Sequence, residues 1–187
     1  WESDFCGNAA PITLANPIAS QMGVMRSSLI GGLIGNVVVN RSRQADRVRV
    51  FEIGRCFLDD PAGAPVAGFR QPLRVAGLCT GTALPEQWGA AARPVDFFDA
   101  KGDVEALLAP AVLRFENAAH PALHPGRAAR ILLDGKDIGV IGEIHPRWVQ
   151  KYELGTAPVV FELELEALLA RALPAYREIS RFPAVTR

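Results

Sequence analysis

Cysteine is scarce in this chain, and the few present are poorly placed for a disulfide framework or a cysteine-rich metal site. The 187 residues include three, Cys6, Cys56 and Cys79, an odd number with no CxxC spacing. Small disulfide-dependent secreted domains usually carry an even set at short spacings. The pattern is instead typical of reduced thiols in a cytosolic protein.

An excess of charge of one sign is also missing. Twenty lysines and arginines balance twenty aspartates and glutamates. The chain therefore has no overall field that would draw a polyanion to its surface. Net charge gives no argument for a nucleic-acid-binding face, although a local basic patch is compatible with it.

Long hydrophobic runs are absent. No stretch reaches the roughly 18 apolar residues of a membrane-spanning helix, and the first ten residues, WESDFCGNAA, lack the basic and apolar regions of a signal peptide. We expect no membrane contact. The chain starts at Trp1 rather than methionine, so we interpret it as a piece of a longer protein. With 49% hydrophobic residues, it can bury the core of one globular domain or of two closely packed lobes.

Strand-like and helix-like patterns alternate along the chain, which predicts an α+β fold with a largely antiparallel sheet flanked by helices. Asp96 is the expected N-cap of a helix that ends near Leu108. The dipeptide Asp134-Gly135 predicts a two-residue hairpin turn. The expected strands are residues 12–15, 48–57, 73–79, 113–116, 128–133, 136–144 and 158–165, and further helices are expected over 146–152 and 166–172.

The first long helix is predicted from Ser27 or Ser28 to about residue 43. Its apolar residues recur at helical spacing, and a serine can cap its first turn. Glycines at positions 31, 32 and 35 oppose the helix, since each costs about 1 kcal/mol relative to alanine. One hypothesis is that they let a partner approach closely; the alternative is a buried core helix.

Two histidines, His120 and His124, lie four residues apart, which is the spacing of a helical zinc site. The prolines between and after them disfavour a helix, and no further ligand pattern completes a tetrahedral set. We expect a rigid loop that caps the sheet, and no metal.

Four arginines between residues 41 and 49 form a basic cluster that could touch RNA phosphates: Arg41, Arg43, Arg47 and Arg49. The simpler interpretation of the first two is a solvated helix end, where cations favour the negative end of the dipole. The glycine run at 31–35 is not a phosphate loop, because no Gly-Lys-Ser/Thr follows it.

Several segments in order resemble one family, the β subunits of bacterial phenylalanyl-tRNA synthetases, in their class II synthetase-like core. The matching segments are NPI from residue 16, MRSSLIGGLIGNVVVNRSRQ (25–44), VRVFEIGRCF (48–57), VDFFDAKGDVEALL (95–108), HPALHPGRAARILLDGKDIGVIGEIHP (120–146) and ISRFPAVTR (179–187). The resemblance spans nearly the whole chain and implies a class II core over residues 1–173, followed by a linker over 174–187.

The resemblance also implies that this copy of the core is catalytically silent. The second class II motif typically carries an arginine that holds phosphate, and Leu58 stands at that position in GRCFLD. An aliphatic side chain cannot supply charged, forked donors. The third motif, a glycine-rich stretch ending in Glu-Arg, has no match, because residues 139–144 hold glycines and Glu143 but no arginine. We therefore expect no catalytic, cofactor-binding or metal-binding residues in this chain.

By resemblance, the whole enzyme is a cytoplasmic α2β2 phenylalanine–tRNA ligase that uses ATP, Mg²⁺ and phenylalanine and binds tRNA(Phe). This chain would be its structural and assembly domain, contacting the α subunit through the first long helix. The expected contact residues are Ser28, Leu29, Gly32, Leu33, Gly35 and Asn36.

Two alternatives remain open from the sequence. One is a free-standing RNA-binding module that uses Arg41, Arg43 and Arg47. The other is an independent enzyme with a pocket among His120, His124, Arg127 and Glu143.

Overall fold

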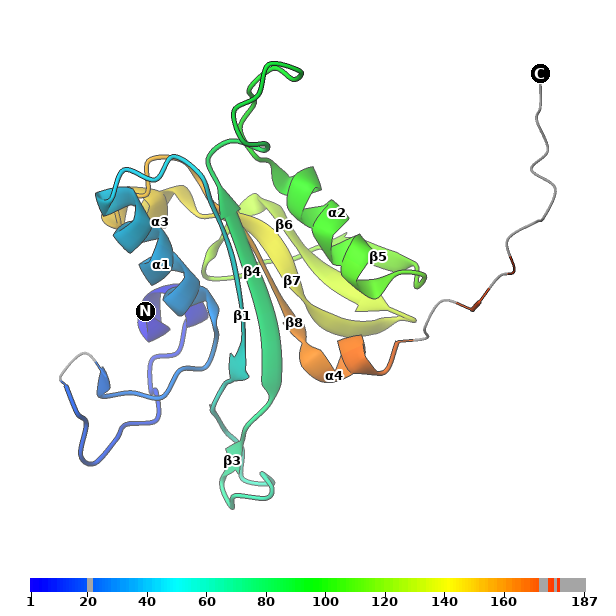
Figure 1. Cartoon of the computed structure of the whole chain (residues 1–187). Helices are drawn as coiled ribbons and strands as arrows, with labels where there is room; N and C mark the ends of the chain where they lie inside the picture. The colour runs from blue at the N-terminus through cyan, green and yellow to red at the C-terminus, as the bar shows by residue number, and fades with distance from the viewer. Residues whose placement is uncertain (20–21, 172–174, 177, 179–187) are drawn as a thin grey trace.

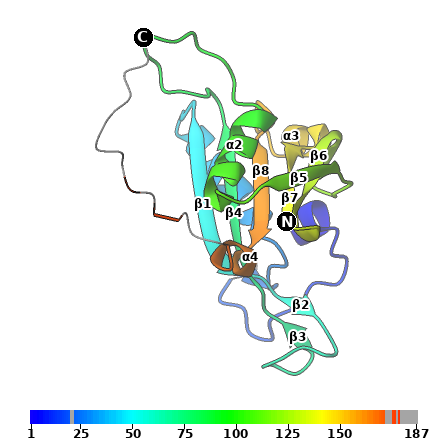
Figure 2. The ribbon, with the colours of Figure 1, turned by 90° about the vertical axis from the view of Figure 1, so that its right-hand side faces the viewer.

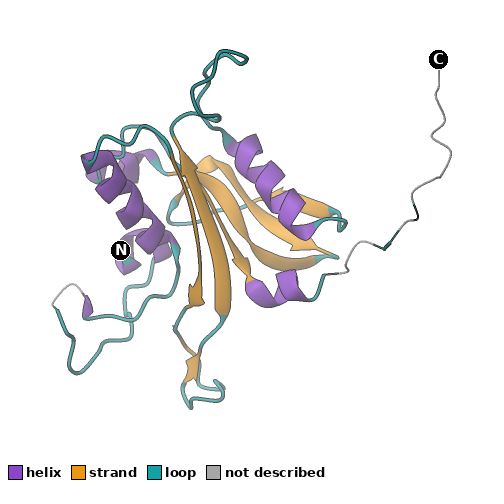
Figure 3. Ribbon diagram, in the orientation of Figure 1, coloured by secondary structure: helices purple, strands orange, loops and turns teal. Residues whose placement is uncertain are grey.

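The fold is a six-stranded antiparallel sheet with helices on both faces (Figures 1 and 3). The structure is a computed structural model and describes residues 1–19, 22–171, 175, 176 and 178. The strand order is β1-β4-β8-β7-β6-β5, and a separate two-stranded ribbon joins β2 to β3. The elements in chain order are η1 (Glu2–Cys6), α1 (Ile30–Ser42), β1 (Val48–Arg55), β2 (Leu58–Asp59), β3 (Phe69–Arg70), β4 (Leu73–Thr80), α2 (Phe97–Leu108), β5 (Leu113–Asn117), β6 (Leu123–Leu133), β7 (Lys136–Ile144), α3 (Pro146–Lys151), β8 (Val159–Glu164) and α4 (Leu165–Leu169).

Each face of the sheet carries its own hydrophobic core, because side chains alternate along each strand. On β4, Ala76 and Leu78 join the core under α1, whereas Val75 and Cys79 join the core under α2. The first core also takes η1 and α3, and the second takes α4. Figure 2 shows α2 lying across the sheet on the side away from α1. The central strands of the sheet are therefore buried on both faces, whereas Phe51 and Ile53 on the edge strand β1 stay exposed. The predicted α+β class is confirmed.

Local signals in the sequence placed two elements correctly. Asp96 caps α2, and its side chain accepts hydrogen bonds from the backbone amides of Phe98 and Asp99 while the Asp99 side chain reaches back to the Asp96 amide. This is a reciprocal capping arrangement. The β6–β7 hairpin turns at Asp134 and Gly135, whose φ angles are 51° and 81°. Both positive angles are those of the predicted two-residue turn.

Other predictions need correction. No strand forms over residues 12–15, where a single bridge joins Thr13 to Val24. Residues 123–126 lie inside β6 rather than in a capping loop, because that strand begins at Leu123. The α4 helix ends at Leu169, short of residue 172, and the short η1 helix and the β2–β3 ribbon had no counterpart in the prediction. The expected linker begins at residue 174, which lies outside the described residues. Residues 179–187, the last segment of the resemblance, lie outside them too.

Substitution of Gly135 by valine should destabilise the fold by about 1 kcal/mol or more, since a β-branched residue is a strong outlier at φ 81°. The measurement is the free energy of unfolding from a urea titration. Gly89→Val is the matched control, because that glycine also has open space around it but no positive φ. Equal midpoints for both variants would contradict the turn assignment.

Candidate functional site

The amino end of α1 is anchored by a buried carboxylate. Glu162 on β8 is 6% exposed and accepts hydrogen bonds from the Ser28 hydroxyl (2.9 Å) and the Leu29 backbone amide (2.6 Å). Arg74 on the neighbouring strand β4 pairs with the same carboxylate at 2.5 Å. A negative group at the first turn also complements the positive end of the helix dipole. The position of α1 on the sheet is thus fixed by charge-assisted bonds as well as by packing.

A second carboxylate extends this anchor to the first residues of the chain. Glu2 in η1 is 8% exposed and accepts hydrogen bonds from the Ser27 amide (3.0 Å) and the Ser27 hydroxyl (2.5 Å). Arg74 also donates to the Ser27 carbonyl at 3.1 Å. Ser27 is therefore occupied by Glu2, and it is the Ser28 hydroxyl that accepts from the Ile30 amide in the first turn of α1 (3.1 Å).

The predicted contact residues on α1 divide into buried and exposed sets. Ser28, Leu29 and Leu33 are 6%, 0% and 1% exposed and pack inside this chain. They are therefore not available at the surface, which corrects half of the predicted set. Gly32 and Asn36 are exposed and Gly35 is half-buried. The accessible residues of α1 before its last turn, which we call the α1 surface, are Gly32, Gly35, Asn36, Val38 and Val39.

The glycines of α1 have different neighbours. A Cβ atom at Gly31 would lie 2.7 Å from Cβ of Trp1, so the close approach at this glycine is made by the chain itself. At Gly32 and Gly35 the nearest atoms are at ordinary contact distances, 3.5 Å to the Glu52 carboxylate and 3.7 Å to the Trp1 ring. Only these two glycines leave α1 backbone open to another chain.

The α1 surface is apolar and slightly hollowed. Val38 is 37% exposed and Val39 is 49% exposed. Next to them is a depression of about 420 Å³, lined by Trp1, Gly35, Val38, Val39, Lys151, Tyr152 and Glu153. Exposed apolar side chains around a hollow are typical of protein contact sites.

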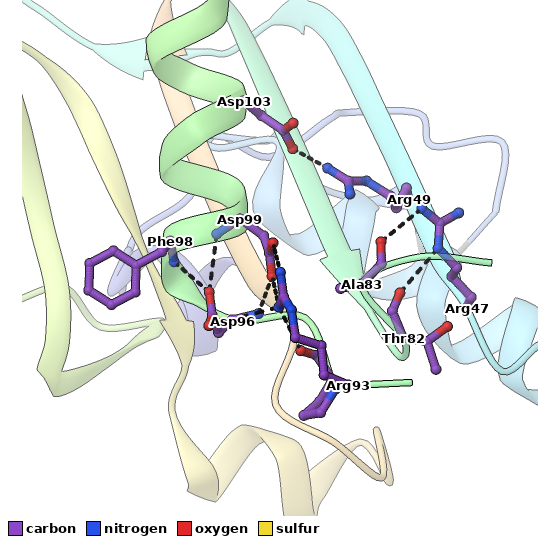
Figure 4. A network of polar contacts seen from close by, with 10 residues as sticks. Arg47, Arg49, Thr82, Ala83, Arg93, Asp96, Phe98, Asp99 and Asp103 are labelled. Carbon is purple, nitrogen blue, oxygen red and sulfur yellow. Dashed lines mark hydrogen bonds and ion pairs between the residues drawn. The ribbon is translucent and has the colours of Figure 1, made fainter. Parts of the chain in front are cut away.

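The predicted arginine cluster does not act as one patch. Arg47 donates to the backbone carbonyls of Thr82 (3.1 Å) and Ala83 (3.4 Å), and Arg49 pairs with Asp103 on α2 (Figure 4). These two guanidinium groups therefore hold the connection after β4 and the α2 helix in place. Arg41 and Arg43 are exposed at the end of α1, where RNA contact stays a prediction.

The predicted histidine pocket is not assembled. His120 lines a cavity of about 380 Å³ together with Arg74, Asp137, Ile138, Gly139, Val140, Glu162, Leu163 and Glu164. His124 instead lies beside His145, with ring centroids 6.3 Å apart. Arg127 and Glu143 form an ion pair at 2.7 Å across β6 and β7. Burial lowers the pKa of His120, so its imidazole is neutral at physiological pH.

No reactive thiol or metal cluster occurs in the part of the chain that the structure describes. Burial raises the pKa of Cys6 and Cys79 to about 11 and that of Cys56 to about 12, so these thiols are protonated at neutral pH. Nowhere among the described residues do three histidine, cysteine, aspartate or glutamate side chains converge as metal ligands. Over the same residues, every helix is too short or too polar to traverse a bilayer.

Comparison with known proteins decides the family. A family model described as the phenylalanyl tRNA synthetase beta chain CLM domain matches residues 2–165. The chain belongs to this family. It is 73% identical over 187 residues to the phenylalanine–tRNA ligase beta subunit of Aromatoleum aromaticum. It is also 64% identical over 190 residues to that of Dechloromonas aromatica and 62% identical over 191 residues to that of Ralstonia nicotianae. All of this chain is covered in each comparison, but it spans only 24% of each relative.

Leu58 is the residue at which the family resemblance implied a lost phosphate-binding arginine. It begins β2 and lies opposite Arg70 on β3. Two nearby guanidinium groups are engaged within the chain, since Arg26 pairs with Glu52 at 2.5 Å and Arg55 donates to the Gln71 carbonyl at 3.3 Å. Arg70 is exposed and pairs with Asp60 only at 3.8 Å. Leu58 is thus an aliphatic side chain in a two-stranded ribbon, paired across it with Arg70.

Sequence reasoning missed the two buried carboxylates that anchor α1. Glu162 interrupts the apolar strand VVFELE, and all residues of β8 before Glu164 are buried. An acidic residue in a strand buried on both faces needs a partner. The acidic residue in an apolar strand was thus a signal for a buried ion pair or hydrogen bond. It could not identify Ser28 or Arg74 as the partners.

Proposed function

We propose that this chain is a non-catalytic structural and assembly domain in the β subunit of phenylalanine–tRNA ligase. The observation that carries the proposal is the family match over residues 2–165, with identity to β subunits over the whole chain. In this proposal residues 1–173 form a class II synthetase-like core, and residues 174–187 link it to a following domain. The whole enzyme is a cytoplasmic α2β2 tetramer that uses ATP and Mg²⁺ to attach phenylalanine to tRNA(Phe).

The assembly role is assigned to the α1 surface. Gly32 and Gly35 expose helix backbone, and Val38 and Val39 offer apolar side chains beside a hollow. A helix anchored by Glu162 and Arg74 presents these groups without reordering, so little conformational entropy is lost on association. We assign the α subunit as the partner of this surface.

The lack of catalysis follows from the residue types near β1. Adenylate formation requires positive, forked donors on the transferring phosphate. Leu58 has none, and Arg26 and Arg55 have their donors directed at Glu52 and backbone carbonyls. In the proposal the α subunit makes phenylalanyl-adenylate, and this domain contributes to assembly by binding the α subunit.

The isolated chain should not catalyse phenylalanine-dependent exchange of pyrophosphate into ATP. The expected rate equals that of a heat-denatured sample, because Leu58 cannot replace the phosphate-binding arginine. The positive control is the complete enzyme assembled from α and full-length β under the same conditions. Exchange by the purified chain that rises with its concentration would contradict a non-catalytic role.

A further inference from the structure

The connection between β4 and α2 forms an arm that projects from one end of the sheet (Figure 1). It comprises residues 81–95 and carries Trp88, whose relative exposure is 103%, with Leu84 at 52%. Tryptophan is highly buried on average, and when it contacts a partner it often dominates the binding energy. A tryptophan held fully in solvent at the end of a projecting arm is therefore a candidate contact residue.

The base of the arm is tied together by the backbone. The Val95 amide donates to the Gly81 carbonyl, and the Ala83 amide donates to the Arg93 carbonyl, both at 2.9 Å. From the connection that follows α1, Arg47 donates to the carbonyls of Thr82 and Ala83. The two sides of the base, joined by a single β-bridge between Thr82 and Pro94, are thus held to each other and to the end of the sheet.

The second side of the base is also held to α2. Arg93 makes two hydrogen bonds to the Asp99 carboxylate, at 2.7 and 2.6 Å, and Asp99 closes the capping arrangement with Asp96 (Figure 4). The Arg93 guanidinium lowers the pKa of Asp99 to about 2, so the pair stays ionised at neutral pH. Bidentate pairs of this kind fix orientation as well as distance. The base of the arm is therefore held in one arrangement, and the tip with Trp88 projects from this fixed base.

The tip has the chemistry of a protein contact rather than an RNA contact. Residues 84–92 read LPEQWGAAA, and Glu86 is the one acidic or basic residue among them. Binding to a nucleic-acid backbone needs cations near the stacking aromatic. The cation nearest in sequence, Arg93, is already paired with Asp99. An apolar tip with one carboxylate instead complements an apolar pocket with a basic rim.

We propose that the arm is a second contact with the α subunit, with Trp88 entering an apolar pocket of α and Glu86 facing a basic group at its rim. The inference rests on the proposed function, and the position of the arm supports it. Its base is bonded to Arg47 in the α1–β1 connection, and Figure 1 places the arm and the carboxyl end of α1 at the same end of the molecule. A single partner could cover both.

The test uses the α subunit and full-length β, with their dissociation constant measured by sedimentation. Trp88→Ala should weaken association about 30-fold, the effect of an anchoring tryptophan, and Trp88→Phe should weaken it less. Val112→Ala is the control, because Val112 is 84% exposed at the other end of α2. It should leave the dissociation constant unchanged. The thermal midpoint of free β should be the same for all four proteins.

An unchanged dissociation constant for Trp88→Ala would overturn the inference. So would a loss of tRNA affinity in the assembled enzyme with normal association, which would make the arm an RNA platform. Failure of the parent β to bind α would overturn the proposed function itself. If the parent binds α and a variant on the α1 surface weakens it while Trp88→Ala does not, only the arm assignment fails.

Discussion

Replacement of Glu162 by alanine is expected to lower the free energy of unfolding by about 3 to 5 kcal/mol, the usual cost of removing one partner from a buried ion pair. The change leaves the Arg74 guanidinium, 23% exposed, without its carboxylate. It also leaves the Ser28 hydroxyl and the Leu29 amide without their acceptor under α1. A urea titration followed by circular dichroism measures the effect.

Two further variants separate this effect from a general loss of charge. Glu164→Ala is the matched control, since Glu164 lies on the same strand but pairs only distantly with Lys136, at 3.8 Å. Its expected change is below about 0.5 kcal/mol, as for exposed pairs. Glu162→Gln keeps an acceptor and should fall between the two. Equal stability of Glu162→Ala and Glu164→Ala would show that α1 does not depend on the carboxylate.

Replacement of Gly32 and Gly35 together by leucine is expected to weaken association with the α subunit about 100-fold, or about 3 kcal/mol, through overlap at a close helix contact. Folding should be affected less than by a change at Gly31, because a Cβ atom at either position meets its neighbours at ordinary contact distances and leucine is a better helix former than glycine. The comparison is between the thermal midpoint of free β and its affinity for α.

Gly31→Leu is the contrasting variant on the same helix. Its first added atom would meet Trp1 at 2.7 Å inside the chain, so the substitution should lower the thermal midpoint of free β. Comparison of the two variants distinguishes Gly31, which packs against Trp1 in the same chain, from Gly32 and Gly35, which we assign to the contact with a partner. A double leucine variant that unfolds like Gly31→Leu would place Gly32 and Gly35 in the chain's own packing.

The predictable parts of the fold depend on residues close in sequence. The Asp96 cap and the Asp134-Gly135 turn each involve bonds or angles within three residues, so the local pattern was sufficient. The apolar residues of α1 recur at helical spacing, which located the helix to within a few residues. Family resemblance added the expected contact helix and the missing arginine at Leu58.

The unpredicted parts depend on residues far apart. Glu162 and Ser28 are separated by 134 residues, and Glu2 and Ser27 by 25. Periodicity marks which face of α1 is apolar, but it cannot say that Leu29 and Leu33 enter the chain's own core while Val38 and Val39 stay exposed. The arginine cluster failed as a patch for the same reason, since the partners of Arg47 and Arg49 lie at Thr82 and Asp103.

The proposed contact between the α1 surface and the α subunit underlies the assembly role of this domain. The most direct measurement is the dissociation constant of α with full-length β, determined by sedimentation for the parent and for Gly32→Leu/Gly35→Leu at equal thermal midpoints. We expect the parent to assemble with α and the variant to associate about 100-fold more weakly. Identical dissociation constants for two folded proteins would contradict it and would assign the α1 surface to something other than the α subunit.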